Sequence, residues 1–271
     1  MNHKTTCAKI MSLAAPFALT LPMQAASLIV TPTNDGTTLV NSILGAGVTL
    51  VSGSVIYSGA NSAASGTFSG GIAAGVGIPT GILMTTGDAI GAVGPNTSNS
   101  YTGSGATTSL EFKFTVDAGN SLFFNYVFAS EEYNEYVGSG FNDSFSFLLD
   151  GTNIALIPST STPVTINNVN LGSNSAFYKN NSPGPFDLQY DGLTTVLTAS
   201  ALNLSAGEHT IKMTISDVGD SSLDSGVFIQ GNSFSNNPTP PTGSVPDGGT
   251  TLALLGLSLA GLAGLQRKFK A

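Results

Sequence analysis

The stretch that decides the fold class runs Asn125-Tyr-Val-Phe-Ala-Ser-Glu-Glu-Tyr-Asn-Glu-Tyr-Val-Gly-Ser-Gly-Phe-Asn-Asp-Ser-Phe-Ser-Phe-Leu-Leu-Asp150. It contains most of one apolar, aromatic-rich segment, Ser121–Ala129, and all of a second, Asp143–Leu149, both with the composition of β-strands. Phe145 and Phe147 alternate with other residues, so both rings are expected on the face that fills a core. The stretch predicts two strands joined by an acidic loop.

Segments of the same character recur on both sides of this stretch, separated by turn residues. Leu110–Val116 and His209–Asp217 show the clearest alternation of apolar and polar residues. The other predicted strands are Thr49–Tyr57, Gly81–Thr86, Ile154–Ile157, Val164–Val169, Thr194–Ala199 and Gly226–Gln230. Many short strands with frequent turns predict an all-β chain folded as an antiparallel β-sandwich or jelly roll.

Two segments depart from the strand pattern. Leu39–Leu44 is expected to be a short helix, because Asp35 and the threonines after it can cap its first turn. Gly59–Gly77 is rich in Gly, Ala and Ser and is expected to be irregular. Nothing in the chain suggests alternation of strands and helices.

Composition narrows the class of protein. The chain has 271 residues, of which 9% are charged and 41% hydrophobic, with 33 glycines and no tryptophan. An average soluble protein has about 25% charged residues. This composition argues against a disordered chain, a coiled coil and a cytosolic helical enzyme, and it favours a β-rich exported protein with a sizeable core.

Charge is strongly segregated along the sequence. All 16 acidic residues lie between Asp35 and Asp247, where they face only three lysines, Lys113, Lys179 and Lys212, for a formal net charge of −13. Nucleic-acid binding needs clustered Lys and Arg residues, so the strongly acidic charge of the body excludes that function. Divalent cations, or neutral and basic surfaces, are the electrostatically suitable partners.

Residues 1–26 have the organisation of a secretory signal peptide. A basic segment precedes the apolar run Ile10–Leu21, and small residues follow, which predicts cleavage near Ala25 or Ala26. A buried N-terminal helix is the alternative. Cys7 lies ahead of the apolar run and would leave with the signal, so the mature chain would have no cysteine and no disulfide.

The C-terminal end divides into a Pro/Gly-rich linker, residues 238–249, and an apolar segment with a basic end, residues 250–271. The linker closes on the motif Val245, Pro246, Asp247, Gly248 and Gly249. The apolar segment predicts a short transmembrane helix. Its basic end would stay inside the cell and leave the body outside.

This tail resembles the PEP-CTERM sorting signals handled by bacterial exosortases, and most closely the variant that begins Val-Pro-Asp-Ser-Gly. It differs in having Gly248 where the variant has Ser, and it lacks Pro-Glu-Pro. The resemblance implies an exosortase-type sorting enzyme as partner. It also implies an inner-membrane intermediate and release to the cell surface or extracellular matrix of a Gram-negative-type bacterium. A permanent single-span anchor is the alternative.

The body, residues 27–237, resembles the choice-of-anchor L domain. The central block is the stretch quoted above, and five further passages agree with it in order and spacing: Gly81–Asp88, Val93–Asn96, Asn153–Asn167, Gln189–Thr198 and Ser216–Ile229. The resemblance implies a surface domain that different bacteria attach through different anchors. It carries no activity, so location is implied more strongly than biochemistry.

Acidic residues in the body gather in three groups: Glu131, Glu132 and Glu135; Asp143 after Asn142; and Asp217, Asp220 and Asp224. Ca²⁺ takes six to eight oxygen ligands and suits flexible loops. We hypothesise that Glu131, Asp143, Asp217 and Asp220 converge on one Ca²⁺ that joins two loops. Solvated turn residues are the alternative. Zinc is disfavoured because the mature chain keeps only His209 as a nitrogen ligand.

The acidic loop and the histidine suggest two further types of site, a sugar-binding site and a catalytic site. Tyr133 and Tyr136 lie in the acidic loop and could stack on sugar rings, although partial burial under the loop would also explain them. Paired catalytic carboxylates are disfavoured, because Glu131 and Glu132 are adjacent and would point to opposite faces of a strand. His209 is expected at the surface rather than in a catalytic triad.

These observations predict an exported, non-enzymatic surface or matrix protein with an adhesive or structural role. Its expected partners are exopolysaccharide or a cell-surface polymer, together with the sorting enzyme and the membrane. A Ca²⁺-dependent carbohydrate-binding module is the alternative function. A hydrolase is the least favoured reading.

Overall fold

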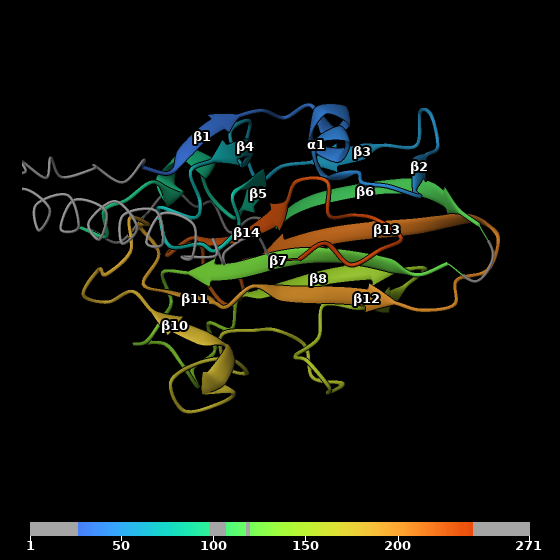
Figure 1. The fold of residues 1–271 in the computed structure, drawn as a ribbon. Coiled ribbons are helices and arrows are strands. Elements are labelled where there is room, and N and C mark those ends of the chain that lie inside the picture. Colours follow the sequence, from blue (N-terminus) through green and yellow to red (C-terminus); the bar gives the residue numbers. More distant parts are fainter. Residues whose placement is uncertain (1–26, 98–106, 118–119, 241–271) are drawn as a thin grey trace, which may run out of the picture.

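The structure is a computed structural model that describes residues 27–97, 107–117 and 120–240 (Figure 1). The named strands of this part all pair antiparallel and form two sheets, which confirms the predicted all-β class. The predicted signal peptide, sorting motif and transmembrane helix lie outside the described residues. Within the described residues, no helix combines the length and apolar character needed to cross a membrane.

The larger sheet of the described chain has eight strands in the order β1-β4-β5-β14-β7-β11-β10, and β12 also pairs with β7. Its strands are β1 (Ile29–Pro32), β4 (Ser65–Ser69), β5 (Thr80–Thr85), β7 (Leu122–Ser130), β10 (Tyr178–Asn180), β11 (Gly192–Thr194), β12 (Leu197–Ala201) and β14 (Ser225–Gln230).

The smaller sheet has six strands in the described chain, in the order β2-β6-β13-β8-β9, and β3 also pairs with β6. Its strands are β2 (Thr49–Leu50), β3 (Ile56–Ser58), β6 (Thr107–Val116), β8 (Ser144–Leu149), β9 (Thr152–Asn153) and β13 (Gly207–Ser216). Figure 1 shows the long strands of both sheets aligned along the molecule, with helix α1 (Gly36–Ile43) beside β3. The short 3₁₀ helices are η1 (Ala89–Ala92) and η2 (Ser175–Phe177).

The main core lies between the two sheets and is rich in aromatic rings. As predicted, Phe145 and Phe147 are buried in it. Phe234 lies at its centre: its ring is 5.1 Å from that of Phe114 in the smaller sheet and 5.5 Å from that of Phe124 in the larger sheet. A residue after the last strand thus packs against both sheets.

A second core covers the outer face of the larger sheet. It includes Leu83, Val127 and Phe228, over which the segments that carry Val76 and Leu188 fold back. Strand β7 is therefore buried on both faces, which explains why its sequence is an almost continuous apolar run. The smaller sheet keeps the simple alternation of buried and exposed residues, as in β6.

Several predicted elements differ from the structure. The segments Ile154–Ile157 and Val164–Val169 form isolated bridges rather than strands, because Pro158 and Pro163 interrupt the ladder between them. Thr49–Tyr57 is divided into β2 and β3 by a turn at Gly53, whose φ of +72° favours glycine.

The Gly-rich segment predicted to be irregular contains a strand, β4, in the larger sheet. Helix α1 starts earlier than predicted, at Gly36, but the predicted cap is confirmed: the Asp35 carboxylate accepts a hydrogen bond of 3.0 Å from the Thr37 amide.

Candidate functional site

Acidic residues stand just outside the paired ends of two central strands of the larger sheet. Ser130, the last residue of β7, pairs with Ser225, the first residue of β14. Glu131 follows the first serine and Asp224 precedes the second, and the Glu131 amide donates a 3.0 Å hydrogen bond to the Asp224 carbonyl. The ladder thus continues one residue beyond the strands and fixes the backbone of both acids.

The smaller sheet repeats this arrangement. Ser144, the first residue of β8, pairs with Ser216, the last residue of β13. Asp143 and Asp217 stand immediately outside this pair. We call the acidic residues gathered here the carboxylate cluster and define it as Glu132, Asp143, Asp217, Asp220 and Asp224.

Asp143 joins the two sheets at this end of the molecule. Its side chain is fully buried, and its Oδ2 accepts a 2.7 Å hydrogen bond from the Ser225 hydroxyl of the larger sheet. Its Oδ1 accepts a 2.9 Å hydrogen bond from the Val218 amide in the loop after β13. Both oxygens of Asp143 are therefore engaged in holding the loops in place.

Glu132, which the sequence analysis did not include among the Ca²⁺ ligands, shares the cluster with Asp143. Residues of even number in β7, such as Tyr126 and Phe128, point into the main core, and Glu132 continues that face. Glu131 continues the outer face, where its charge acts on Tyr190 of the second core. The alternation within β7 was the sequence signal that distinguishes the two glutamates.

The Glu132 carboxyl group is buried, and its hydrogen-bonding capacity is not fully satisfied. The residue is 1% exposed, and its Oε2 has no hydrogen-bond partner among the described residues. In the loop after β13, Oδ1 of Asp217 is likewise buried without a partner in the described part of the chain. Asp220 is exposed in the same loop, where its Oδ1 accepts a 3.2 Å hydrogen bond from the Ser222 amide.

The electrostatics of the cluster favour a positive charge. Burial, together with the smaller effect of the charges of Asp143, Asp220 and Asp217, raises the pKa of Glu132 to about 8. Burial and neighbouring carboxylates also raise the pKa of Asp217 to about 7 and that of Asp143 to about 6. The cost of ionising these carboxyl groups together would fall if a cation lay among them.

The cluster is not a preassembled metal centre. In the described part of the chain, no group of three or more Asp, Glu, His or Cys side chains is arranged so that it could hold a metal ion as it stands. The structure thus brings the predicted Asp143, Asp217 and Asp220 into one electrostatic neighbourhood, without the finished ligand set that the sequence analysis expected.

The two predicted glycan-contact residues have different environments. Tyr133 is fully buried, packs 4.8 Å from the ring of Tyr178, and donates a 2.8 Å hydrogen bond to the Val169 carbonyl. It cannot stack on a sugar, so this part of the prediction is wrong. Tyr136 is 37% exposed and lies edge-on to Phe141, 5.4 Å away.

His209 was expected at the surface but is buried. It shares the inner face of β13 with Ile211 and Met213, because all three have odd numbers. Its Nδ1 lies 2.7 Å from the Asp150 carboxylate and its Nε2 lies 3.0 Å from the Ser205 carbonyl. The histidine therefore has a structural role in joining β13 to the turn after β8.

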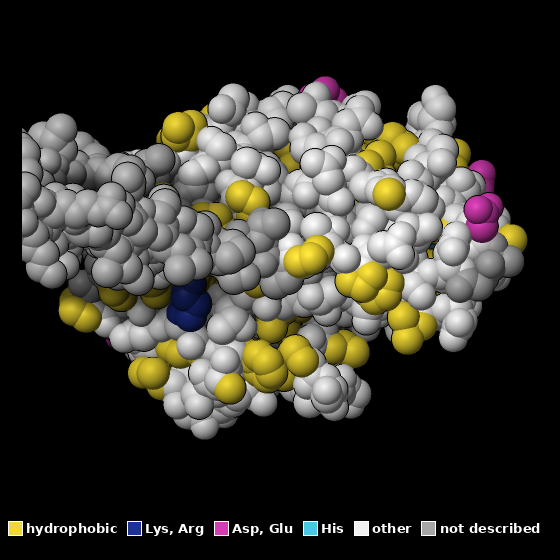
Figure 2. Space-filling view, viewed as in Figure 1, with side chains coloured by type: hydrophobic (Ala, Val, Ile, Leu, Met, Phe, Trp, Pro, Cys, Tyr) yellow, Lys and Arg dark blue, Asp and Glu magenta, His cyan; other side chains and the backbone are white. Residues whose placement is uncertain are grey.

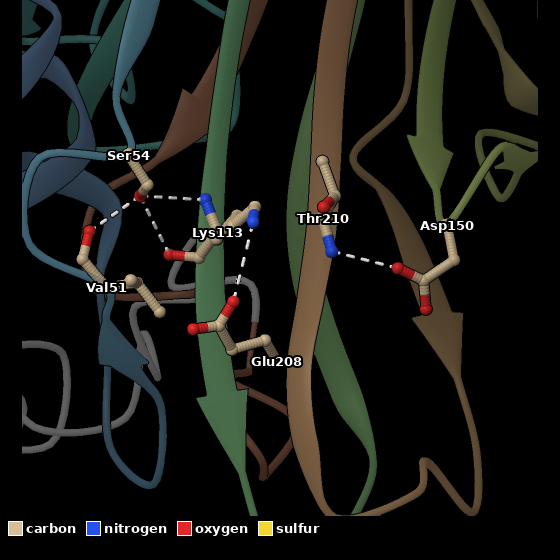
Figure 3. Close-up of polar contacts among 6 residues, drawn as sticks. All are labelled: Val51, Ser54, Lys113, Asp150, Glu208 and Thr210. Atoms are coloured by element: carbon tan, nitrogen blue, oxygen red, sulfur yellow. Dashed lines mark hydrogen bonds and ion pairs between the residues drawn. The ribbon is translucent and has the colours of Figure 1, made fainter.

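A groove of about 390 Å³ lies between the β2–β3 turn and strands β3, β6 and β13. Figure 3 shows that its polar groups bind one another: the Ser54 hydroxyl donates a 2.6 Å hydrogen bond to the Val51 carbonyl and accepts one of 3.0 Å from the Lys113 amide. Lys113 also forms an exposed 3.5 Å ion pair with Glu208. The groove has no buried polar group directed at a ligand.

A two-sheet antiparallel β-sandwich with acidic loops, followed by a short apolar tail with a basic end, has the organisation of a surface-sorted protein domain. The family model for the choice-of-anchor L domain matches residues 29–235, and the model for the VPDSG-CTERM motif matches residues 244–269. The chain therefore belongs to the choice-of-anchor L domain family. Both resemblances found in the sequence are confirmed.

The sorting motif implies recognition by an exosortase-type sorting system and export to the cell envelope or surface. Comparisons with curated proteins and with solved structures gave no match.

Proposed function

We propose that this chain is an exported, non-enzymatic protein whose β-sandwich has an adhesive or structural role at the cell surface or in the extracellular matrix. The observation that carries the proposal is the combination, on one chain, of a surface-domain family over residues 29–235 and a sorting motif over residues 244–269. The sandwich would be the displayed part, and the tail would determine where it is displayed.

The surface of the sandwich supports contact with an uncharged polymer. Figure 2 shows a face on which uncharged polar groups predominate and charged side chains are few, with scattered apolar side chains among them. Such a face can bind exopolysaccharide or a neutral cell-surface polymer through many weak hydrogen bonds and apolar contacts. The acidic net charge would disfavour binding to anionic polymers.

The proposal is tested by locating an epitope-tagged full chain in its host and comparing it with a variant that lacks residues 250–271. We expect the full chain at the cell surface or in the matrix, with a lower mass than the unprocessed chain if the sorting enzyme cleaves it. We expect the truncated variant to miss that location. An unchanged location without the tail would contradict the proposed route, and an unchanged mass would indicate a permanent anchor.

Adhesion itself needs a separate measurement. Purified protein should bind to host cells or isolated matrix polymer without consuming either. Release of soluble sugars or peptides during the incubation would instead indicate a hydrolase.

A second candidate function, Ca²⁺-dependent carbohydrate binding, is favoured by the surroundings of Tyr136. Its partly exposed ring is supported by Phe141, and Val218, 38% exposed, lies in the loop that carries Asp217 and Asp220. An exposed aromatic ring beside acidic loops is suited to stacking on a sugar.

A glycan array would identify the sugar. Tyr136→Ala should abolish the signal if Tyr136 binds the sugar. The exposed Ile56 in β3 of the smaller sheet is the control, and Ile56→Ala should leave the signal unchanged. Equal loss in both variants, or no signal at all, would count against this function.

A further inference from the structure

The carboxylate cluster lies where the two sheets are fastened together. Ser130 with Ser225 in one sheet and Ser216 with Ser144 in the other are the last paired positions at this end of the sandwich. The hydrogen bond from the Ser225 hydroxyl to Asp143 connects the two pairs. Any ligand held here would contact the β7–β8 loop and the β13–β14 loop at once.

Two buried carboxylate oxygens point to a missing ligand. Within the described chain, Oε2 of Glu132, in a residue that is 1% exposed, has no hydrogen-bond partner, and neither does the buried Oδ1 of Asp217. Leaving a buried charged oxygen without a partner is costly, and such groups in folded proteins are normally paired or bound to a metal. These oxygens are an observation separate from the mere number of acidic residues.

We infer that the carboxylate cluster binds one Ca²⁺, with Glu132 and Asp217 as carboxylate ligands and Asp143 as the positioning residue. Asp220, exposed on the loop, would turn inward to join them. Asp143 is assigned to positioning because Val218 and Ser225 already occupy its two oxygens. Since no three acidic side chains among the described residues are in place to hold an ion now, binding must complete the site by moving the loop.

The chemistry of the cluster selects Ca²⁺ among common cations. The cluster consists entirely of oxygen ligands, which disfavours Zn²⁺. Mg²⁺ requires near-ideal octahedral geometry and gives up its water reluctantly, whereas Ca²⁺ accepts six to eight oxygens in irregular loops, including backbone carbonyls and water. This inference goes beyond the proposed adhesive function, and it can hold whether or not the surface binds a glycan.

The inference is tested with the purified full chain, freed of metal by a chelator and then titrated with CaCl₂. We expect heat of binding by calorimetry and a rise in melting temperature over the range typical of extracellular Ca²⁺ modules, a Kd of roughly 10⁻⁴ to 10⁻³ M. No heat and no rise in melting temperature in that range would overturn the inference. An equal rise with MgCl₂ at the same concentration would also overturn it, because it would indicate general screening of charge.

Two variants locate the site. Glu132→Gln replaces one buried carboxyl group by an amide of the same shape, so it should weaken Ca²⁺ binding by about tenfold or more while leaving the metal-free protein at least as stable as the wild type. Asp217→Asn should weaken binding similarly, at a half-buried position that tolerates substitution. Asp117→Asn, at an exposed acid just after β6 and at the end of that strand away from the cluster, is the matched control and should bind Ca²⁺ as the wild type does. Binding that survives both cluster variants would overturn the assignment.

Discussion

At the scale of single residues, Phe234 is the side chain on which both sheets depend. Its ring contacts Phe112 and Phe114 from one sheet and Phe124 from the other. Phe234→Ala would leave a cavity between the sheets that neither could fill, so we expect the free energy of unfolding to fall by about 3 to 5 kcal/mol.

Urea denaturation would measure this loss. Leu202→Ala, at a residue that is 63% exposed, should change the free energy of unfolding by less than about 0.5 kcal/mol. A similar small effect for Phe234→Ala would mean that its ring is not a shared part of the core.

The buried His209 gives the stability of the protein a defined pH dependence. Burial lowers the pKa of His209, but hydrogen bonds to Asp150 and Ser205 outweigh it and leave the pKa above its ordinary value of 6.5. Burial raises the pKa of Asp150, but hydrogen bonds from His209 and Thr210 leave it below its ordinary value of 3.8.

The histidine stabilises the fold fully below pH 6.5 and loses this effect as the pH rises through its folded pKa. The aspartate stabilises the fold above pH 3.8 and loses this effect as the pH falls through its folded pKa. We therefore expect His209→Gln to lower the free energy of unfolding most between pH 3.8 and 6.5. The loss should be about 1 to 2 kcal/mol, because the aspartate is half-exposed and solvent weakens its interaction with the histidine.

Thermal unfolding of His209→Gln and the wild type at pH 5 and pH 8.5 would measure this loss of stability. The carboxylate cluster also makes stability depend on pH, but it does so equally in both proteins and cancels in the comparison. A difference that grows towards pH 8.5 would contradict the assignment.

Residue-level features differed in how far the sequence could reveal them. The Asp35 cap was predictable because it depends only on the next few residues. The choice of Glu132 over Glu131 and the burial of His209 depend on which face of a strand meets the core, and alternation within β7 and β13 carried that information. The burial of Tyr133 depends on Tyr178 and Val169, which are distant in sequence, so no local pattern could predict it.

At the scale of elements, the strands with regular alternation or long apolar runs were predictable, and the short strands at or next to the edges of the larger sheet were not. Strands β6, β7, β8 and β13 supply 14 of the 31 buried residues of the main core, so their sequences are under strong packing constraints. Strands β1, β4 and β10 have little apolar patterning and exist because a neighbouring strand offers them hydrogen bonds. Whether such segments form strands is decided by their pairing with a neighbouring strand and not by their local sequence.

Because β7 is buried on both faces, substitutions on the outer face of the larger sheet should affect stability more than those on the outer face of the smaller sheet. Val127 lies on the outer face of the larger sheet but is fully buried in the second core. Val127→Thr would bury a hydroxyl there and should lower the free energy of unfolding by about 1 to 3 kcal/mol.

The comparison is Lys212→Thr on the outer face of the smaller sheet, where the side chain is 46% exposed and the expected change is within about 0.5 kcal/mol. Equal, small effects in both variants by urea denaturation would show that the outer face of the larger sheet is not a packed core.

At the scale of the whole molecule, the segment after β14 connects the folded body to the C-terminal tail that carries the sorting motif. The Phe234 amide donates a 3.0 Å hydrogen bond to the Ile43 carbonyl, and Ser235 exchanges hydrogen bonds of 2.9 and 3.0 Å with Phe123. The chain remains attached as far as Thr239, whose carbonyl accepts a 2.7 Å hydrogen bond from Asn125. The body therefore needs residues well beyond its last strand, but its described contacts end before the sorting motif begins.

It follows that the position at which the chain ends decides whether the body keeps its stability. A chain ending at Pro240 keeps the contacts of Phe234 and Thr239, so we expect its melting temperature to match that of the full chain within about 2 °C. A chain ending at Gly231 loses Phe234 from the core and should not give a cooperative thermal transition. If the chain ending at Pro240 melted far below the full chain, residues of the tail would have to contribute to the fold as well as to sorting.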